Sequence, residues 1–223
     1  MDVWVVVPAY NEAAVIAAVI ADVKRVTPNV AVIDDGSSDA TAAVARTAGA
    51  AVLRHAINRG QGAALQTGIA YALRRGAQIV VTFDSDGQHS ADDIPALIAP
   101  IMAGDADIVL GSRFLANTGS VPTLRRIVLR LGIVFTRLTS GLRITDAHNG
   151  LRAFSRDAAS AMHIRLDRMA HASELMDQIR ESGRRYVEVP VHVRYTEYSR
   201  DKGQRGWHAL RIAFDYLIGK WVR

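Results

Sequence analysis

Short β-rich runs alternate with longer helical patterns through the first half of the chain. This alternation is typical of βαβ units, which build a mostly parallel sheet with helices on both faces. The sequence predicts strands over residues 3–7, 30–33, 51–53, 78–83 and 108–110, and helices over residues 12–25, 38–48, 62–74 and 91–102. We therefore expect an α/β fold with a doubly wound sheet.

The rhythm changes after Arg113. A helix is predicted over residues 122–139, a strand at "GLRAFS", a helix over residues 172–182 and a further strand at "RRYVEVPVHVRY". The sequence contains no internal repeat, low-complexity tract or linker rich in Pro, Gly and Ser. We therefore expect residues 1–223 to form one domain.

Composition and charge limit the class of protein. Hydrophobic residues make up 49% of the chain and charged residues 22%, as in ordinary globular proteins. Cysteine is absent, which excludes a disulfide framework and fits a reducing compartment such as the cytoplasm. The formal net charge of +5 favours an anionic partner, either a nucleotide, a lipid phosphate, a membrane surface or nucleic acid. No nucleic-acid partner is expected, because the sequence shows neither a helix-turn-helix nor an aromatic stacking platform.

Four of the predicted strands end in polar clusters, which read "PAYNE", "DDGSSDAT", "DSDGQHS" and "GSRF". Ligands of open α/β sheets bind beyond the carboxyl ends of the strands. One pocket could therefore collect all four clusters. In the second cluster, Gly36 suits a turn and Ser38 or Asp39 a helix cap, whereas Asp34 or Asp35 is predicted to contact a nucleotide.

Two carboxylates, Asp84 and Asp86, stand one residue apart directly after an apolar run. Their repulsion is costly unless a cation, a hydrogen-bond network or solvent relieves it. Together with the amide of Gln88 they are hard oxygen donors, which suit Mg²⁺ or Mn²⁺ and do not suit zinc. A nucleoside diphosphate would complete the coordination of such a metal. A solvated acidic loop is the alternative, and His89 is interpreted as a loop residue rather than a ligand.

Five segments, in their order and spacing, resemble the family 2 glycosyltransferases of the GT-A fold: "VVVPAYNE", "DDGSSDAT", "DSDGQHS", "GSRF" and "TDAHNGLRAF". The most similar branch is that of the dolichyl- or polyprenyl-phosphate glycosyltransferases. The resemblance covers nearly the whole chain. It implies a mixed, mostly parallel GT-A sheet, with residues 1–112 as the nucleotide-sugar-binding half and residues 113–223 as the acceptor-side half.

The same resemblance assigns residues to a donor site. It implies a nucleoside site lined by Pro8, Tyr10, Glu12 and Asp35, with Ser85 against the nucleotide. It implies a metal site for Mg²⁺ or Mn²⁺ made by Asp84, Asp86 and Gln88. It places basic groups around the phosphates at Arg113, Arg125, Arg200 and Lys202. Arginine suits this task because its fork binds phosphate oxygens bidentately, although Arg125 could instead be a surface cation.

Asp86, Asp146 and Arg113 are the expected catalytic residues. If the acceptor is a sugar hydroxyl, inversion needs a general base, for which Asp146 is the candidate. If the acceptor is a lipid phosphate, its oxygen is already anionic, and Asp146 would orient groups or bind a cation. The alternative for Asp146 is a capping or loop role. Glu174 also resembles a family position, but it could simply form an ion pair with a neighbouring arginine.

Two basic amphipathic segments, around residues 122–143 and 207–223, bear on the membrane. Each suits a helix lying on an anionic bilayer, with Trp207 and Trp221 at the interface, but a core-packed helix is an equal alternative. No stretch approaches the roughly 18 consecutive apolar residues of a membrane span, and the N-terminus does not resemble a secretory signal. We therefore expect peripheral attachment at the cytoplasmic face, or attachment through a separate membrane protein.

The function implied by the resemblance is metal-dependent, inverting transfer of a sugar from a nucleotide sugar to a polyprenyl phosphate. Transfer to a saccharide hydroxyl is the alternative within this class. A module that binds a nucleotide sugar or a lipid phosphate without turnover is the alternative from another class.

Overall fold

The computed structural model describes residues 2–116, 142, 144–146, 149–165 and 171–194. The helix predicted over residues 122–139, the second basic segment at 207–223, and the site residues Arg125, Arg200 and Lys202 lie outside the described residues. Within the described ranges, no helix is long and apolar enough to cross a membrane.

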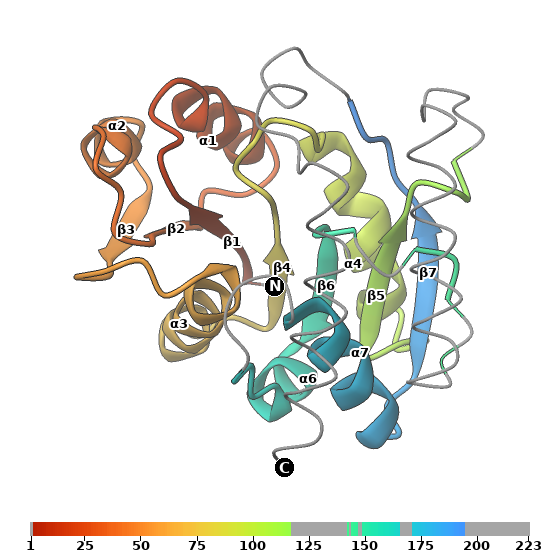
Figure 1. Cartoon of the computed structure of the whole chain (residues 1–223). Helices are drawn as coiled ribbons and strands as arrows, with labels where there is room; N and C mark the ends of the chain where they lie inside the picture. The colour runs from red at the N-terminus through yellow and green to blue at the C-terminus, as the bar shows by residue number, and fades with distance from the viewer. Residues whose placement is uncertain (1, 117–141, 143, 147–148, 166–170, 195–223) are drawn as a thin grey trace, which may run out of the picture.

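A seven-stranded sheet forms the centre of the described structure (Figure 1). Its strands are β1 (Val3–Ala9), β2 (Val30–Asp34), β3 (Ala51–Arg54), β4 (Ile79–Thr82), β5 (Ile108–Ser112), β6 (Arg152–Ser155) and β7 (Tyr186–Pro190). They lie in the order β3-β2-β1-β4-β6-β5-β7. Strand β6 runs antiparallel to both of its neighbours, and every other pair is parallel. The predicted doubly wound, mostly parallel mixed sheet is confirmed.

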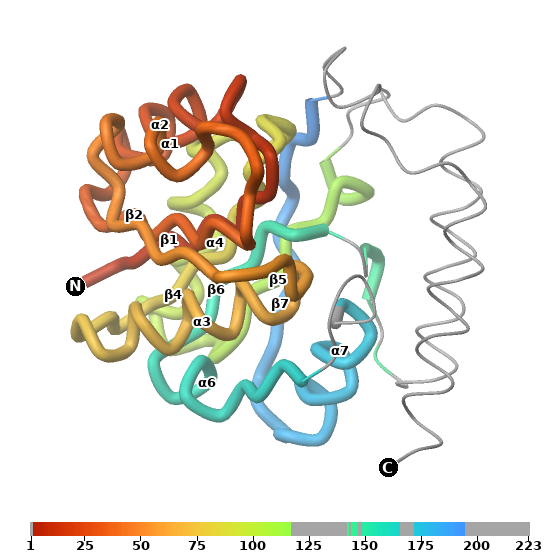
Figure 2. Tube along the Cα trace, turned by 60° about the vertical axis from the view of Figure 1, so that its left-hand side comes forward, coloured from red at the N-terminus to blue at the C-terminus, as the bar shows by residue number. Residues whose placement is uncertain are grey.

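Helices cover both faces of this sheet. They are α1 (Ile16–Lys24), α2 (Thr41–Thr47), α3 (Gln61–Arg74), the short 3₁₀ helix η1 (Ala91–Asp93), α4 (Ile94–Met102), α6 (Arg156–Ala161) and α7 (His171–Glu181). Apolar side chains of α3, α6 and α7 share one buried cluster with Trp4 and Val6 of β1. Those of α1 and α4 share the other with Val5 and Val7. Figure 2 shows the sheet between these two layers. Because successive strand residues point to opposite faces, the continuous apolar run of β1 serves both cores.

Helices α1 and α2 begin later than the sequence predicts, at Ile16 and Thr41 instead of residues 12 and 38. Ahead of the two helices, a set of hydrogen bonds joins the segments that follow β1 and β2. Asn11 N–H donates to Ser37 Oγ (2.9 Å), Ser38 N–H donates to Asn11 Oδ1 (2.8 Å), and Glu12 N–H donates to Thr41 Oγ1 (2.8 Å). These contacts hold the two strand ends together as one surface.

The last predicted strand is also shorter than expected, because β7 ends at Pro190. Proline has no N–H to donate to a sheet ladder. Beyond it the chain continues extended as far as Arg194, where it lies beside the loop that follows β4 through an isolated antiparallel bridge between His89 and Val193.

Candidate functional site

Asp84 lies just beyond the carboxyl end of β4, where its carboxylate is held from three sides. A Cβ at Gly150 would come within 2.1 Å of Asp84 Oδ2, so only glycine leaves room for the carboxylate there. Gln61 Nε2 donates to Asp84 Oδ1 (3.0 Å), and His89 Nε2 lies 3.1 Å from Oδ2. His89, which the sequence leads us to interpret as a loop residue, is therefore a buried neighbour of the acidic pair.

Asp86 follows in the same loop and carries an unfavourable charge. Burial, followed by the charge of Asp84, raises the pKa of the Asp86 carboxyl, and the charge of Glu12 adds to this shift. The N–H of Gln88 opposes it by donating to Asp86 Oδ1 (3.0 Å). Thus the Asp84, Asp86 and Glu12 carboxylates lie near one another, and Gln88 contacts this group through its backbone N–H. Two carboxylates of this kind are the protein ligands that Mg²⁺ commonly takes when substrate phosphates supply others, so the donor set fits the expected metal.

Asp35 has a role that the sequence does not predict. It is buried, and its oxygens accept hydrogen bonds from the N–H groups of Arg59 (3.0 Å) and Gly60 (2.6 Å), with His55 Nδ1 at 2.7 Å. Asp35 therefore fixes the loop over residues 55–60 against the end of β2. Gln61, the next residue, contacts Asp84, so this loop connects the expected nucleoside side of the site to the acidic pair.

The remaining residues of the expected nucleoside site surround the same strand ends. Pro8 is buried within β1, Glu12 and Ser85 are buried in the loops that follow β1 and β4, and Tyr10 is 47% exposed. Asp34 is buried and has other contacts: its Oδ1 accepts the N–H of Ser37 (3.0 Å), and its Oδ2 lies 3.1 Å from Arg54 Nε.

Arg113 and Asp146, expected at the phosphates and at the acceptor, contact each other. Arg113 Nε and the backbone N–H of Arg113 both donate to Asp146 Oδ2, at 2.6 and 3.2 Å, and both residues are buried. Glu188 of β7 supports this pair by accepting the N–H groups of Thr145 (2.8 Å) and Asp146 (3.2 Å). Glu188 is not predicted from the sequence, although a charged residue inside the apolar pattern "YVEVPV" is a signal that could have indicated it.

Arg152 is a second site residue that the sequence does not predict. It is buried on β6, paired with Thr82 of β4 and Leu110 of β5. Burial lowers the pKa of the Arg152 guanidinium, and the negative charges of Asp84 and Asp146 oppose that shift. The buried Arg152 cation therefore lies near both Asp84 of the acidic pair and Asp146 of the Arg113–Asp146 pair. Glu174, by contrast, is buried on α7, where its Oε2 accepts the N–H of Arg165 (3.0 Å).

The model of the family described as Glycosyl transferase family 2 matches residues 4–162, which include the acidic pair, Arg113, Asp146 and Arg152. The chain belongs to glycosyl transferase family 2. This membership confirms the resemblance found in the sequence.

Several relatives of this glycosyltransferase are similar over nearly their full length. An uncharacterized protein of Methanocaldococcus jannaschii is 36% identical and covers 98% of this chain and 92% of its own. The UDP-N-acetylglucosamine–dolichyl-phosphate N-acetylglucosaminyltransferase of Methanococcus voltae is 31% identical, with 98% and 96% covered. The undecaprenyl-phosphate mannosyltransferase of Micrococcus luteus is 30% identical, with 86% and 83% covered.

Among solved structures, the fold matches glucosyl-3-phosphoglycerate synthase from Mycobacterium tuberculosis, crystallised with Mn²⁺, UDP and phosphoglyceric acid. The TM-score is 0.71 at 22% identity, and the match covers 97% of this chain and 77% of that one. The match confirms the GT-A fold of this glycosyltransferase.

The raised pKa of Asp86 yields a test of the acidic pair without substrate. The native state binds this proton more tightly than the unfolded chain, so stability falls as pH rises from the ordinary carboxyl pKa of about 4 through the raised value. Asp86→Asn should therefore raise the melting temperature of the metal-free protein at pH 7.5, by about 2–4 °C for each kcal/mol of relieved repulsion. The gain should vanish at low pH. Thermal denaturation in EDTA measures the change in melting temperature. An unchanged or lower melting temperature at pH 7.5 would contradict the predicted relief of repulsion.

Arg113→Ala should destabilise the fold by about 3–5 kcal/mol, because it leaves the buried charge of Asp146 without its main partner. Arg185→Ala is the matched control, since the pair of Arg185 with Asp107 is exposed and is expected to contribute about 0–1 kcal/mol. Urea denaturation of both variants measures the difference. Equal losses would show that burial does not strengthen the Arg113–Asp146 pair.

Proposed function

We propose that this glycosyltransferase moves a sugar, with inversion, from a nucleoside-diphosphate sugar to a polyprenyl phosphate, with Mg²⁺ or Mn²⁺ at the acidic pair. The observation that carries the proposal is the half-buried, mutually repelling pair of Asp84 and Asp86 just beyond β4, where Gln61 and His89 contact Asp84 and Gly150 leaves room for its carboxylate. A cation bound between the two carboxylates would relieve their repulsion more fully than the hydrogen bonds around them do.

In this proposal Asp84 and Asp86, with Gln88, hold the cation. When bound, the cation supplies positive charge that stabilises the departing diphosphate. Pro8, Tyr10, Glu12, Asp35 and Ser85 would position the nucleoside. Arg113, Arg125, Arg200 and Lys202 are proposed as phosphate contacts, and the last three lie outside the described residues.

The geometry of Asp146 favours a phosphate acceptor over a hydroxyl. Its Oδ2 already accepts two hydrogen bonds from Arg113, and a third charge, that of Arg152, lies close by. A carboxylate oxygen engaged in this way is poorly placed to take the proton of an attacking hydroxyl. A phosphate oxygen needs no such base, because it is anionic at neutral pH. Asp146 then acts as an orienting group for Arg113.

The names of the relatives support the same acceptor. Two of them are named for transfer to dolichyl phosphate and to undecaprenyl phosphate. We propose that the chain meets such a lipid at the cytoplasmic face of a membrane through its basic segments, either alone or with a separate membrane protein. The net charge of +5 agrees with an anionic surface.

The test is a transfer assay with radiolabelled UDP- and GDP-sugars, Mn²⁺ or Mg²⁺, and undecaprenyl or dolichyl phosphate, in which label is followed into the organic phase. Transfer should require metal and lipid phosphate. Asp86→Asn should lower kcat/KM by more than the roughly 10–100-fold typical of groups that only orient metal ligands. Asp92→Asn is the control, because Asp92 is an exposed carboxylate a few residues along.

Three results would contradict the proposal in different ways. Transfer to a saccharide alone would identify a hydroxyl acceptor. Binding of nucleotide sugar without turnover on either acceptor would identify a binding module. Full activity in EDTA would show that the reaction does not depend on a metal ion.

A further inference from the structure

The loop that carries the acidic pair is held along one side by the chain beyond β7. His89 and Val193 form an antiparallel bridge, and the N–H of Arg194 donates to the carbonyl oxygen of Gln88 (2.8 Å). Residues 191–194 thus form a strap, by which we mean this extended segment alongside residues 88–90. The strap is far from the loop in sequence, and a further side-chain contact joins it to the helix that follows the loop.

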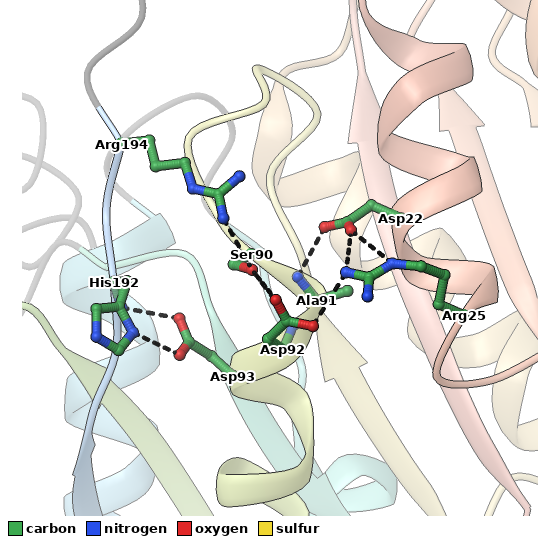
Figure 3. A network of polar contacts seen from close by, with 8 residues as sticks. All are labelled: Asp22, Arg25, Ser90, Ala91, Asp92, Asp93, His192 and Arg194. Carbon is green, nitrogen blue, oxygen red and sulfur yellow. Dashed lines mark hydrogen bonds and ion pairs between the residues drawn. The ribbon is translucent and has the colours of Figure 1, made fainter.

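Asp93 makes that contact (Figure 3). Its Oδ2 accepts the backbone N–H of His192 (2.8 Å), and its Oδ1 lies 2.9 Å from His192 Nδ1. The side chain of Asp93 is only 8% exposed, so its carboxylate is largely shielded from bulk water. Asp93 stands at the N-cap of α4 but makes no capping hydrogen bond there. An aspartate at this position usually caps its own helix, and here it reaches across to the strap instead.

The other side of the loop is anchored on α1. Asp22 Oδ2 accepts the N–H of Ala91 (2.8 Å), and Arg25 contacts both Asp22 and Asp92 (Figure 3). The Arg25 contacts are exposed and contribute little. The loop is therefore fixed by two carboxylates that accept backbone N–H groups, Asp22 on α1 and Asp93 facing the strap.

Two of the residues that the strap contacts, Gln88 and His89, also contact the acidic pair. Gln88, whose carbonyl accepts from Arg194, donates its own N–H to Asp86 Oδ1 (3.0 Å). His89, which bridges to Val193, places Nε2 3.1 Å from Asp84 Oδ2. A shift of the strap would therefore move a neighbour of each carboxylate.

We propose that Asp93 is a positioning residue for the metal-binding loop, which acts by clamping His192 and so keeping the strap in register with Gln88 and His89. That the loop binds a metal rests on the proposed function. That Asp93 holds the strap through His192 rests on the contacts alone. The other side-chain contacts of the strap are weaker candidates for holding it in register. Arg194 Nη2 lies 3.5 Å from Ser90 Oγ, at the outer limit of a hydrogen bond, and the His192 side chain is 61% exposed.

The experiment compares Asp93→Ala with Asp107→Ala. Asp107 is a matched control because it accepts the N–H of Arg185 (3.1 Å) next to the opposite end of β7. The first measurement is hydrogen–deuterium exchange without metal. Asp93→Ala should speed exchange at the amides of residues 88–91 as well as in the strap, and Asp107→Ala should speed exchange only around residues 184–188.

The second measurement is the dissociation constant of Mn²⁺ in the presence of UDP, followed by the electron paramagnetic resonance of free Mn²⁺. Asp93→Ala should weaken Mn²⁺ binding about tenfold, the lower end of the range for groups that orient metal ligands, and Asp107→Ala should leave it unchanged. His192→Ala should have a smaller effect, because the backbone N–H remains to bind Asp93. If Asp93→Ala does not fold, Asp93→Asn replaces it, since its amide keeps only one acceptor oxygen.

The outcomes separate the two proposals. Unchanged exchange at residues 88–91, or equal Mn²⁺ affinity in the Asp93 and Asp107 variants, would overturn the positioning role. Failure of the unaltered protein to bind Mn²⁺ with UDP would contradict the proposed function. The exchange result would then still test whether Asp93 positions the loop through the strap.

Discussion

The repulsion between Asp84 and Asp86 is the constraint on which the site depends. A buried strand brings these charges to the edge of the sheet, where water cannot fully screen them, and burial together with the charge of Asp84 raises the pKa of Asp86. Neighbouring residues keep Asp84 in this position despite the repulsion. Gly150 makes room for one carboxylate, while Gln61 and His89 hold it in place. A protein selected for stability alone would gain from removing one of the two charges, which is why we propose a cation at this pair.

The antiparallel strand β6 connects this pair to the Arg113–Asp146 pair. By lying between β4 and β5 it brings Gly150 against Asp84 and buries Arg152 near both Asp84 and Asp146. Asp146 in turn binds Arg113, and Glu188 binds the backbone of Asp146. Charges alternate in sign from one half of the site to the other. A change at any of them alters the field at its neighbours, because buried charges are weakly screened.

Local features of the sequence predict much of this structure. Apolar runs give the strands, and the polar clusters that follow them give the strand-end location of Asp84, Asp86 and Glu12. Contacts between distant residues escape such reasoning. Arg113 and Asp146 are 33 positions apart and Asp93 and His192 are 99 apart, and neither pair has a local pattern. The burial of Arg152 depends on where β6 inserts, which periodicity does not specify. The hydrogen bond from Glu12 N–H to Thr41 Oγ1, which joins the segment before α1 to the first residue of α2, is another contact of this kind.

The most direct measurement is anomalous diffraction from crystals of the protein grown with Mn²⁺ and UDP. We predict one strong manganese peak within coordination distance of the carboxylates of Asp84 and Asp86, at about the 2.0–2.1 Å typical of Mg²⁺, with UDP phosphate oxygens in the same shell. A peak at another place, or UDP bound with no metal at the acidic pair, would contradict it.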